Sequence, residues 1–226
     1  PDAARQVIHQ IAAALDRDGA AALVAEVGGQ ANPLWTGLGL VNLDLAELDY
    51  ASALERLTPL KPLVATEPGL ADRVVGLEAL CLLQTGKTQE AKAAYEGVLA
   101  SQPNNVQALN NLSYMLLTTL NDPEAALPLA ERAAQLSAQN PDILDTYGMA
   151  LHRVGRLEEA RLQLETSVGR KAKPSSLLHL GQLYADLNFI GRARTRLEEA
   201  IDQAQATNDE ETALLARRAL EQIEER

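Results

Sequence analysis

The sequence predicts an all-α protein built as a stack of antiparallel helix pairs. Three observations support this fold class. Hydrophobic residues make up 46% of the 226 residues but aromatic residues only 3%, so the core must consist mostly of Ala, Leu and Val. No run of β-branched residues alternates with polar ones, as a half-buried strand would require. Finally, small residues recur along the chain at a nearly constant spacing.

The recurring small residues predict five helix pairs. In the first helix of each pair the spacing from one pair to the next is 33 to 38 residues, and the series is Val41, Ala79, Ser113, Gly148 and Gly181. The second helices give the same range of spacings, with the series Ala53, Ala91, Ala126, Ala160 and Ala193. Small side chains let two helices approach closely, and a pair with apolar surface on both sides must stack on the next pair.

The order of elements follows from this period. Residues 1–30 are expected to form a helix pair, interpreted as a degenerate repeat. A solenoid over residues 31–205 follows, in units of about 34–66, 72–105, 106–140, 141–173 and 174–205. Residues 206–226 are expected to form a capping helix, with the apolar stripe Ala213, Ala216, Leu220 and Ile223 and a charged outer face. Because the chain begins with Pro1 instead of Met, we expect it to be a piece of a longer or processed protein.

Local signals mark the helix ends. Asn105, Asp122 and Asn140 stand where they can accept hydrogen bonds from the first backbone N–H groups of a helix, and a proline follows the last two directly. Gly86 and Gly155 stand where tight turns separate paired helices. Pro128 lies inside a predicted helix, which it is expected to kink or shorten.

The period near 34 residues, with small residues at these offsets, resembles the tetratricopeptide repeat of bacterial proteins. The resemblance is good over residues 72–201 and fair over 34–60. It departs from the family pattern at the leading Trp, which Val75, Leu109, Leu144 and Leu177 replace, and at Asp44, where an aromatic or aliphatic residue is expected. The resemblance implies a right-handed α-solenoid whose first helices line a concave groove.

The resemblance further implies that this groove holds a peptide or a helix of a partner protein. Side chains of the first helices that are not needed for packing are expected to line it: Asn110, Asn111, Tyr114, Thr118, Asp142, Asp145, Thr146, Met149, His152, Arg153, Leu178, His179, Gln182 and Asp186. Some members of the family grip a partner's C-terminal carboxylate with a Lys, Arg and Asn set. Of the matching positions only Asn111 fits that set, so this mode is not expected.

No catalytic set and no cofactor or metal site is predicted, and the protein is not expected to be an enzyme. His152 and His179 can form a polar cluster with Asp145, Asp186 and Arg153, interpreted as groove lining, with a metal or acid–base site as the alternative. Adjacent carboxylates such as Glu158 and Glu159 point about 100° apart on a helix, so they are not expected to act together as a catalytic pair. The single Cys81 is interpreted as a small core residue.

Charge and hydropathy restrict the partners. A net charge of −11 argues against nucleic-acid binding, which needs clustered cations. No stretch approaches the roughly 20 apolar residues of a membrane span, so no membrane insertion is expected. The leading hypothesis is a protein-binding scaffold. The alternative is an assembly or oligomerisation domain of a larger bacterial protein that handles envelope or polysaccharide components. This alternative includes an exported protein and a homo-oligomer. The compartment, cytoplasmic or periplasmic, is left open.

Overall fold

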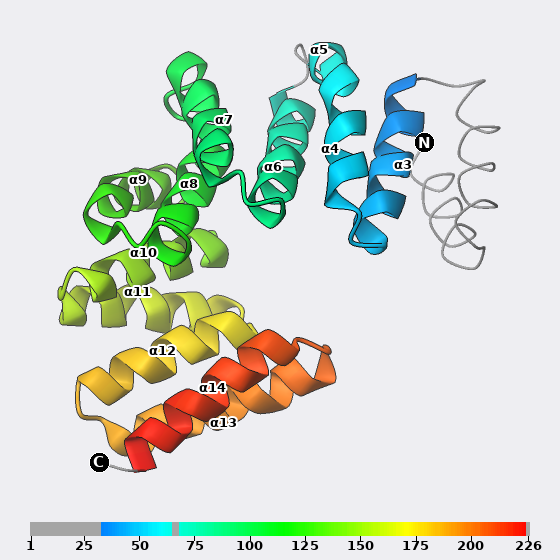
Figure 1. Cartoon of the computed structure of the whole chain (residues 1–226). Coiled ribbons are helices and arrows are strands. Elements are labelled where there is room, and N and C mark those ends of the chain that lie inside the picture. The colour runs from blue at the N-terminus through cyan, green and yellow to red at the C-terminus, as the bar shows by residue number, and fades with distance from the viewer. Residues whose placement is uncertain (1–32, 65–67, 225–226) are drawn as a thin grey trace. The chain divides into compact units, whose positions relative to one another are not determined.

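The computed structural model describes residues 33–64 and 68–224, and every regular element in these ranges is a helix (Figure 1). The helix pair expected over residues 1–30 lies outside the described residues. The chain divides into two compact units, residues 1–101 and 102–226. A separate cluster of buried apolar side chains lies in each unit.

The described part of the first unit contains two stacked helix pairs. Its elements are α3 (Pro33–Ala46), α4 (Tyr50–Leu57), the 3₁₀ turn η1 (Thr58–Leu60), α5 (Lys61–Val64), α6 (Pro68–Gln84) and α7 (Thr88–Ser101). Helix α3 packs against α4, α6 packs against α7, and α4 joins the two pairs by packing on α6.

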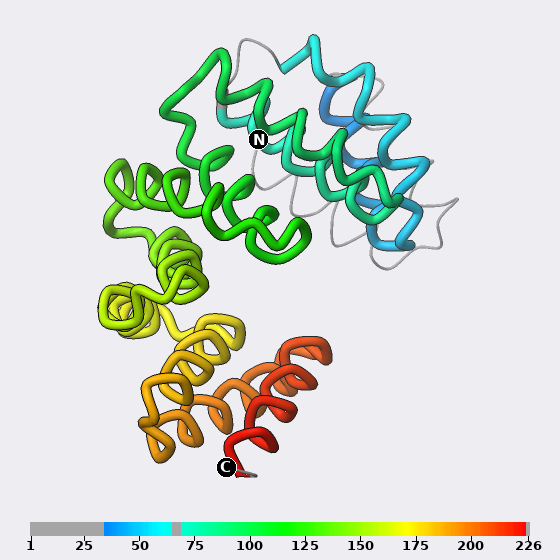
Figure 2. Tube along the Cα trace, turned by 60° about the vertical axis from the view of Figure 1, so that its left-hand side comes forward, coloured from blue at the N-terminus to red at the C-terminus, as the bar shows by residue number. Residues whose placement is uncertain are grey.

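The second unit contains three further pairs and a final helix. Its elements are α8 (Val106–Thr118), α9 (Pro123–Leu136), α10 (Pro141–Arg153), α11 (Leu157–Arg170), α12 (Pro174–Asp186), α13 (Ile190–Ala206) and α14 (Glu210–Glu224). From α9 to α14 each helix packs on the next, and α8 packs on α9. In addition α10 contacts α8 and α12, and α12 contacts α14, so the first helices of the pairs are neighbours (Figures 1 and 2).

The recurring small residues all lie in the core, which confirms the helix-pair period. Eight of them are 0% exposed, and the other two, Gly148 and Gly181, are also buried. The two glycines are required by close approach. A Cβ placed on Gly148 would lie 2.6 Å from Cγ of Leu164, and one on Gly181 would lie 2.8 Å from Cγ of Leu197. The second helix therefore packs directly on the backbone of the first.

The predicted helix ends are confirmed. The side chains of Asn105, Asp122 and Asn140 accept hydrogen bonds from backbone N–H groups at the starts of α8, α9 and α10. Gly86 and Gly155 adopt φ of +77° and +81° in the turns after α6 and α10. Three other turns use an asparagine in this left-handed region, namely Asn121, Asn188 and Asn208. Helix α9 continues through Pro128, which is exposed, so the expected shortening of this helix is not found.

In the described part of the first unit, Asp44 and Cys81 are buried among mainly aliphatic side chains. The carboxylate of Asp44 is buried, at 2% exposed, and Oδ2 accepts a hydrogen bond of 2.7 Å from Nε of Arg56 on α4. This ion pair explains how a charged residue is tolerated where the repeat favours an apolar one. Cys81 is 0% exposed, as predicted for a core residue, and burial raises the pKa of its thiol.

Candidate functional site

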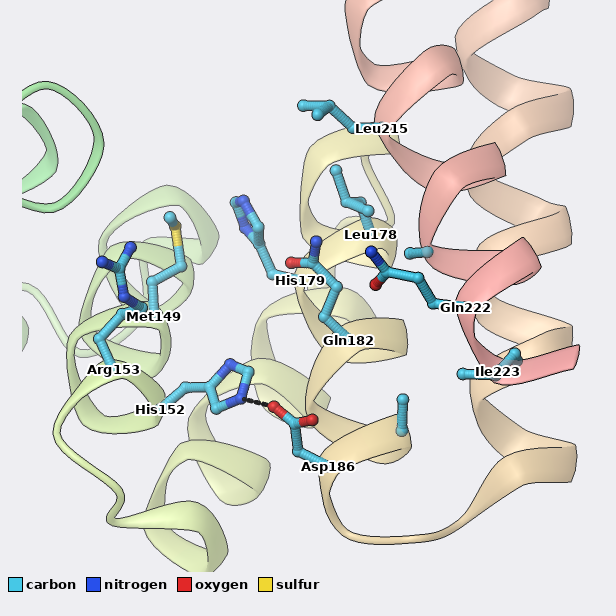
Figure 3. A pocket seen from close by; sticks show the side chains of 12 residues that line it. Met149, His152, Arg153, Leu178, His179, Gln182, Asp186, Leu215, Gln222 and Ile223 are labelled. Atoms are coloured by element: carbon cyan, nitrogen blue, oxygen red, sulfur yellow. Dashed lines mark hydrogen bonds and ion pairs between the residues drawn. The ribbon is translucent and has the colours of Figure 1, made fainter. Parts of the chain in front are cut away.

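A cavity of about 330 Å³ lies in the second unit where α10, α12 and α14 meet (Figure 3). Each of the three helices contributes side chains spaced at three to four residues, so one face of each helix forms a wall. The lining residues are Met149, His152, Arg153, Leu178, His179, Gln182, Ala185, Asp186, Leu215, Ala219, Gln222 and Ile223. Seven of the fourteen residues that the sequence placed in the groove are therefore brought together at this cavity.

The cavity has an apolar part. Leu178 and Ile223 are 3% and 5% exposed, because their side chains also belong to the core beneath. Leu215 is 42% exposed, so a large part of its side chain remains accessible at the cavity. Met149 stands opposite on α10 (Figure 3). Flexible and aliphatic side chains of this kind adapt to an apolar group that enters from solvent.

Two His–Asp pairs connect α10 to α12 beside the apolar part. Nε2 of His152 lies 2.9 Å from Oδ2 of Asp186, as Figure 3 shows, and Nδ1 of His179 lies 3.0 Å from Oδ2 of Asp145. The two pairs are reciprocal, because each helix supplies one histidine and one aspartate. Both pairs join residues 34 apart in sequence, which is one repeat period. The polar cluster thus fixes neighbouring first helices in register and orients the histidines at the cavity wall.

Several of the predicted groove residues, including Arg153 of the cavity lining, make contacts between or within helices. The guanidinium of Arg153 donates hydrogen bonds to the carbonyl of Leu117 and the side-chain oxygen of Asn121. Asp142 forms an ion pair with Lys173. Thr146 is 4% exposed, and its hydroxyl donates to the carbonyl of Asp142. Thr146 therefore lies beneath the groove surface.

The four predicted residues on α8, namely Asn110, Asn111, Tyr114 and Thr118, do not line the cavity. Tyr114 is 47% exposed, and the hydroxyl of Thr118 donates to its carbonyl. The side-chain oxygen of Asn110 is buried and accepts no hydrogen bond within the described residues.

The environment of Tyr114 connects α8 electrostatically to the helices of the cavity. Its phenol has a raised pKa, first because the surrounding protein desolvates it, and then because of the negative charges of Asp145, Glu211 and Asp209. Asp145 belongs to α10, whereas the other two carboxylates lie at the start of α14 and in the turn before it. The carboxylates of two further elements therefore act on the exposed tyrosine of α8.

Sequence reasoning missed the α14 wall of the cavity. It assigned α14 a core stripe and a charged outer face, and the structure does bury Ala213, Ala216 and Ile223. However, Leu215 forms a second apolar edge of α14 at the cavity (Figure 3). Ala219 also lines the cavity. The adjacent pair Leu214 and Leu215, outside the core stripe, was the signal available in the sequence.

Two properties of the described residues limit the chemistry of this surface. None of the described helices has the length and apolar character needed to cross a membrane. Among the same residues, no group of three or more His, Cys, Asp and Glu side chains is arranged to hold a metal ion. The arrangement at the cavity offers apolar contact, hydrogen-bonding imidazoles and fixed charges.

Comparison with known proteins finds the tetratricopeptide repeat in part of the chain. The family model described as "Tetratricopeptide repeat" matches residues 77–141. A curated TPR repeat-containing protein of Pseudomonas aeruginosa is 33% identical over 85 residues. This match covers 38% of the chain and 14% of the relative, so the chain corresponds to a small part of that protein's length.

Solved structures share the fold. A thermophilic TPR protein of Thermus thermophilus superimposes with a TM-score of 0.62 at 20% identity, covering 84% of this chain and 97% of that one. YrrB, a TPR protein with an unusual peptide-binding site, gives a TM-score of 0.53 at 21% identity, covering 86% of this chain and 97% of its own. At these identities the likeness establishes the helical solenoid alone.

Proposed function

We propose that the chain, a tetratricopeptide-repeat protein, binds a segment of a partner protein at the cavity formed by α10, α12 and α14. Tetratricopeptide repeats generally mediate protein–protein interactions and typically act as scaffolds rather than as enzymes. The chain therefore acts as a protein-binding module, and the surface that binds the partner is the cavity.

The cavity is the observation that carries the proposal. It combines a half-exposed leucine with buried aliphatic side chains and a small set of oriented polar groups, the composition expected of a recognition site. The His–Asp pairs hold α10 and α12 in register, so the walls are formed before a partner arrives. A preformed site loses less conformational entropy when it binds. The peptide-binding site of YrrB shows that this fold can serve such a purpose in another protein.

The proposal is tested by capture of a partner from an extract of the source organism. Leu215→Arg places a charge at the cavity mouth, and Leu214→Arg makes the same change on the neighbouring residue, which is 47% exposed and does not line the cavity. Both residues are between 40% and 50% exposed, so both variants are expected to fold, which circular dichroism can check. We expect Leu215→Arg to lose the partner and Leu214→Arg to retain it.

Two results would contradict the proposal. A partner retained equally by both variants would place its site elsewhere. Capture of further copies of the chain alone would favour the assembly-domain hypothesis instead. In that case the apparent molecular mass in analytical ultracentrifugation would rise with protein concentration.

A further inference from the structure

The polar surroundings of the cavity differ between its two ends. The pairs Asp145–His179 and His152–Asp186 occur in the same order along α10 and α12, so these first helices run in the same direction. The end of the cavity nearer the helix C-termini contains Arg153, whose guanidinium is hydrogen-bonded to the α8–α9 region. The end nearer the helix N-termini lies beside the residues one turn before the lining residues Met149 and Leu215.

Two of the cavity helices carry a carboxylate one turn before an apolar lining residue. On α10, Asp145 precedes Met149 by four residues, and on α14, Glu211 precedes Leu215 by four residues. Residues four apart lie on the same face of a helix, at about 5–6 Å between their Cβ atoms. Both carboxylates therefore lie on the cavity-facing sides of their helices, at the end opposite Arg153. We call Asp145, Asp209, Glu211 and Tyr114 the acidic rim.

Tyr114 provides an independent indication that these groups share one region. The carboxylates that raise the pKa of its phenol are Asp145, Glu211 and Asp209, and no cation is among the causes. The negative potential of α10 and of the α14 start therefore reaches an aromatic ring that is 47% exposed. An exposed aromatic ring beside carboxylates attracts a cationic side chain through its π face and through the charges.

We infer that the segment bound at the cavity is basic, with an aliphatic side chain that enters the cavity and a Lys or Arg about one helical turn away that meets the acidic rim. This inference rests on the proposed function and names the class of ligand. Charge complementarity decides the choice of occupant. An acidic segment with the same aliphatic residue would meet the accessible carboxylates of Asp209 and Glu211. It would also be repelled by the charge of Asp145, which is buried and paired with His179. The aliphatic residue provides contact area, while the cationic residue provides orientation and specificity.

Selection from a phage-displayed library of random 12-residue peptides tests the inference directly. Peptides are selected on the wild-type chain after removal of those that also bind Leu215→Ser. We expect enrichment of sequences in which Leu, Ile, Val or Met stands three or four residues from Lys or Arg. Enrichment of acidic peptides would overturn the inference while leaving the proposed function intact. Recovery of no peptide that depends on Leu215 would count against both.

Matched variants then separate the acidic rim from the general acidity of the chain. Glu211→Gln removes a rim charge, and Glu210→Gln removes the same charge from the adjacent exposed residue of α14. For a selected peptide labelled with fluorescein, anisotropy is expected to show binding weakened about three- to tenfold by Glu211→Gln and unchanged by Glu210→Gln. Equal weakening by both variants would mean that only the overall charge of −11 attracts the peptide and would overturn the assignment of the rim.

The phenol of Tyr114 gives a readout that affinity alone does not. In protein labelled with ¹³Cζ-tyrosine, with the signal assigned by its loss in Tyr114→Phe, the pKa of Tyr114 is expected to be raised above the usual value of a tyrosine phenol. Because a bound cation offsets the carboxylates, the peptide should lower this pKa, as should Glu211→Gln. A pKa that is unchanged by saturating peptide would show that the basic residue does not reach the rim.

Discussion

The α3–α4 pair and the α10–α11 pair place small residues at the same offset but complete their cores differently. In α10–α11 the contact is between Gly148 and Leu164, and no charged side chain takes part. In α3–α4 the residue equivalent to Gly148 is Val41. Three residues later, Asp44 is buried and forms an ion pair with Arg56. The repeat period thus specifies where the helices touch. The side chains that fill the interior differ between the pairs: aliphatic packing on glycine in one, and a buried ion pair in the other.

The largest expected effect is at the glycine contact. In Gly148→Leu, the first added carbon alone would lie 2.6 Å from Cγ of Leu164 and 3.3 Å from its backbone nitrogen. The second helix must then move, and we expect a loss of about 1–3 kcal/mol in the free energy of unfolding. Chemical denaturation followed by circular dichroism measures it.

Gly169→Ala is the matched control on α11, because nothing lies within 4 Å of an added Cβ at that position. It is expected to leave stability unchanged or raise it by about 0.5–1 kcal/mol, since alanine favours the helix. A tolerated Gly148→Leu would show that the close approach of α10 and α11 is not needed.

The ion pair of α3–α4 is expected to give the next effect. Arg56→Ala removes the guanidinium from a carboxylate whose side chain is 3% exposed, and we expect a loss of about 1–3 kcal/mol. Arg194→Ala removes one partner of an ion pair whose side chains are 45% and 49% exposed, and is expected to cost less than about 0.5 kcal/mol. Equal costs in thermal or chemical unfolding would mean that burial does not strengthen the Asp44 pair.

The smallest effect is expected at Ser113, the residue equivalent to Gly148 in α8. Its hydroxyl donates a hydrogen bond of 3.0 Å to the carbonyl of Ala126 on α9, with both groups buried. Ser113→Ala keeps the size of the side chain and removes this bond, at an expected cost of about 0.5–1.5 kcal/mol. A cost as large as that of Gly148→Leu would indicate that hydrogen bonding, and not close packing, determines the stability of the helix pairs.

The sequence was sufficient to predict the features that depend on short-range rules. The small residues revealed the pairs because close helix contact excludes larger side chains, and Asn105 and Asn140 marked helix starts because capping is local. The turns at Asn121 and Asn188 were not foreseen, because asparagine adopts positive φ less regularly than glycine.

The candidate site was harder to predict because it depends on how separate helices face one another. The His–Asp pairs nevertheless had a signal in the sequence, since Asp145 with His179 and His152 with Asp186 are each one period apart. Residues one period apart on consecutive first helices become neighbours. The sequence marks Leu214 and Leu215 as apolar residues outside the core stripe but does not indicate which of them lines the cavity, because the rotation of the terminal helix about its axis is decided by its packing on α12 and α13.

The most direct test of the binding site is to map where a selected peptide lies on the chain. Backbone amide shifts of ¹⁵N-labelled protein would be followed as the peptide is added. The cavity assignment predicts that the largest changes occur on the cavity faces of α10, α12 and α14, around Met149, His179 and Leu215. Changes centred on the second helices α9, α11 and α13, with those faces unaffected, would contradict it.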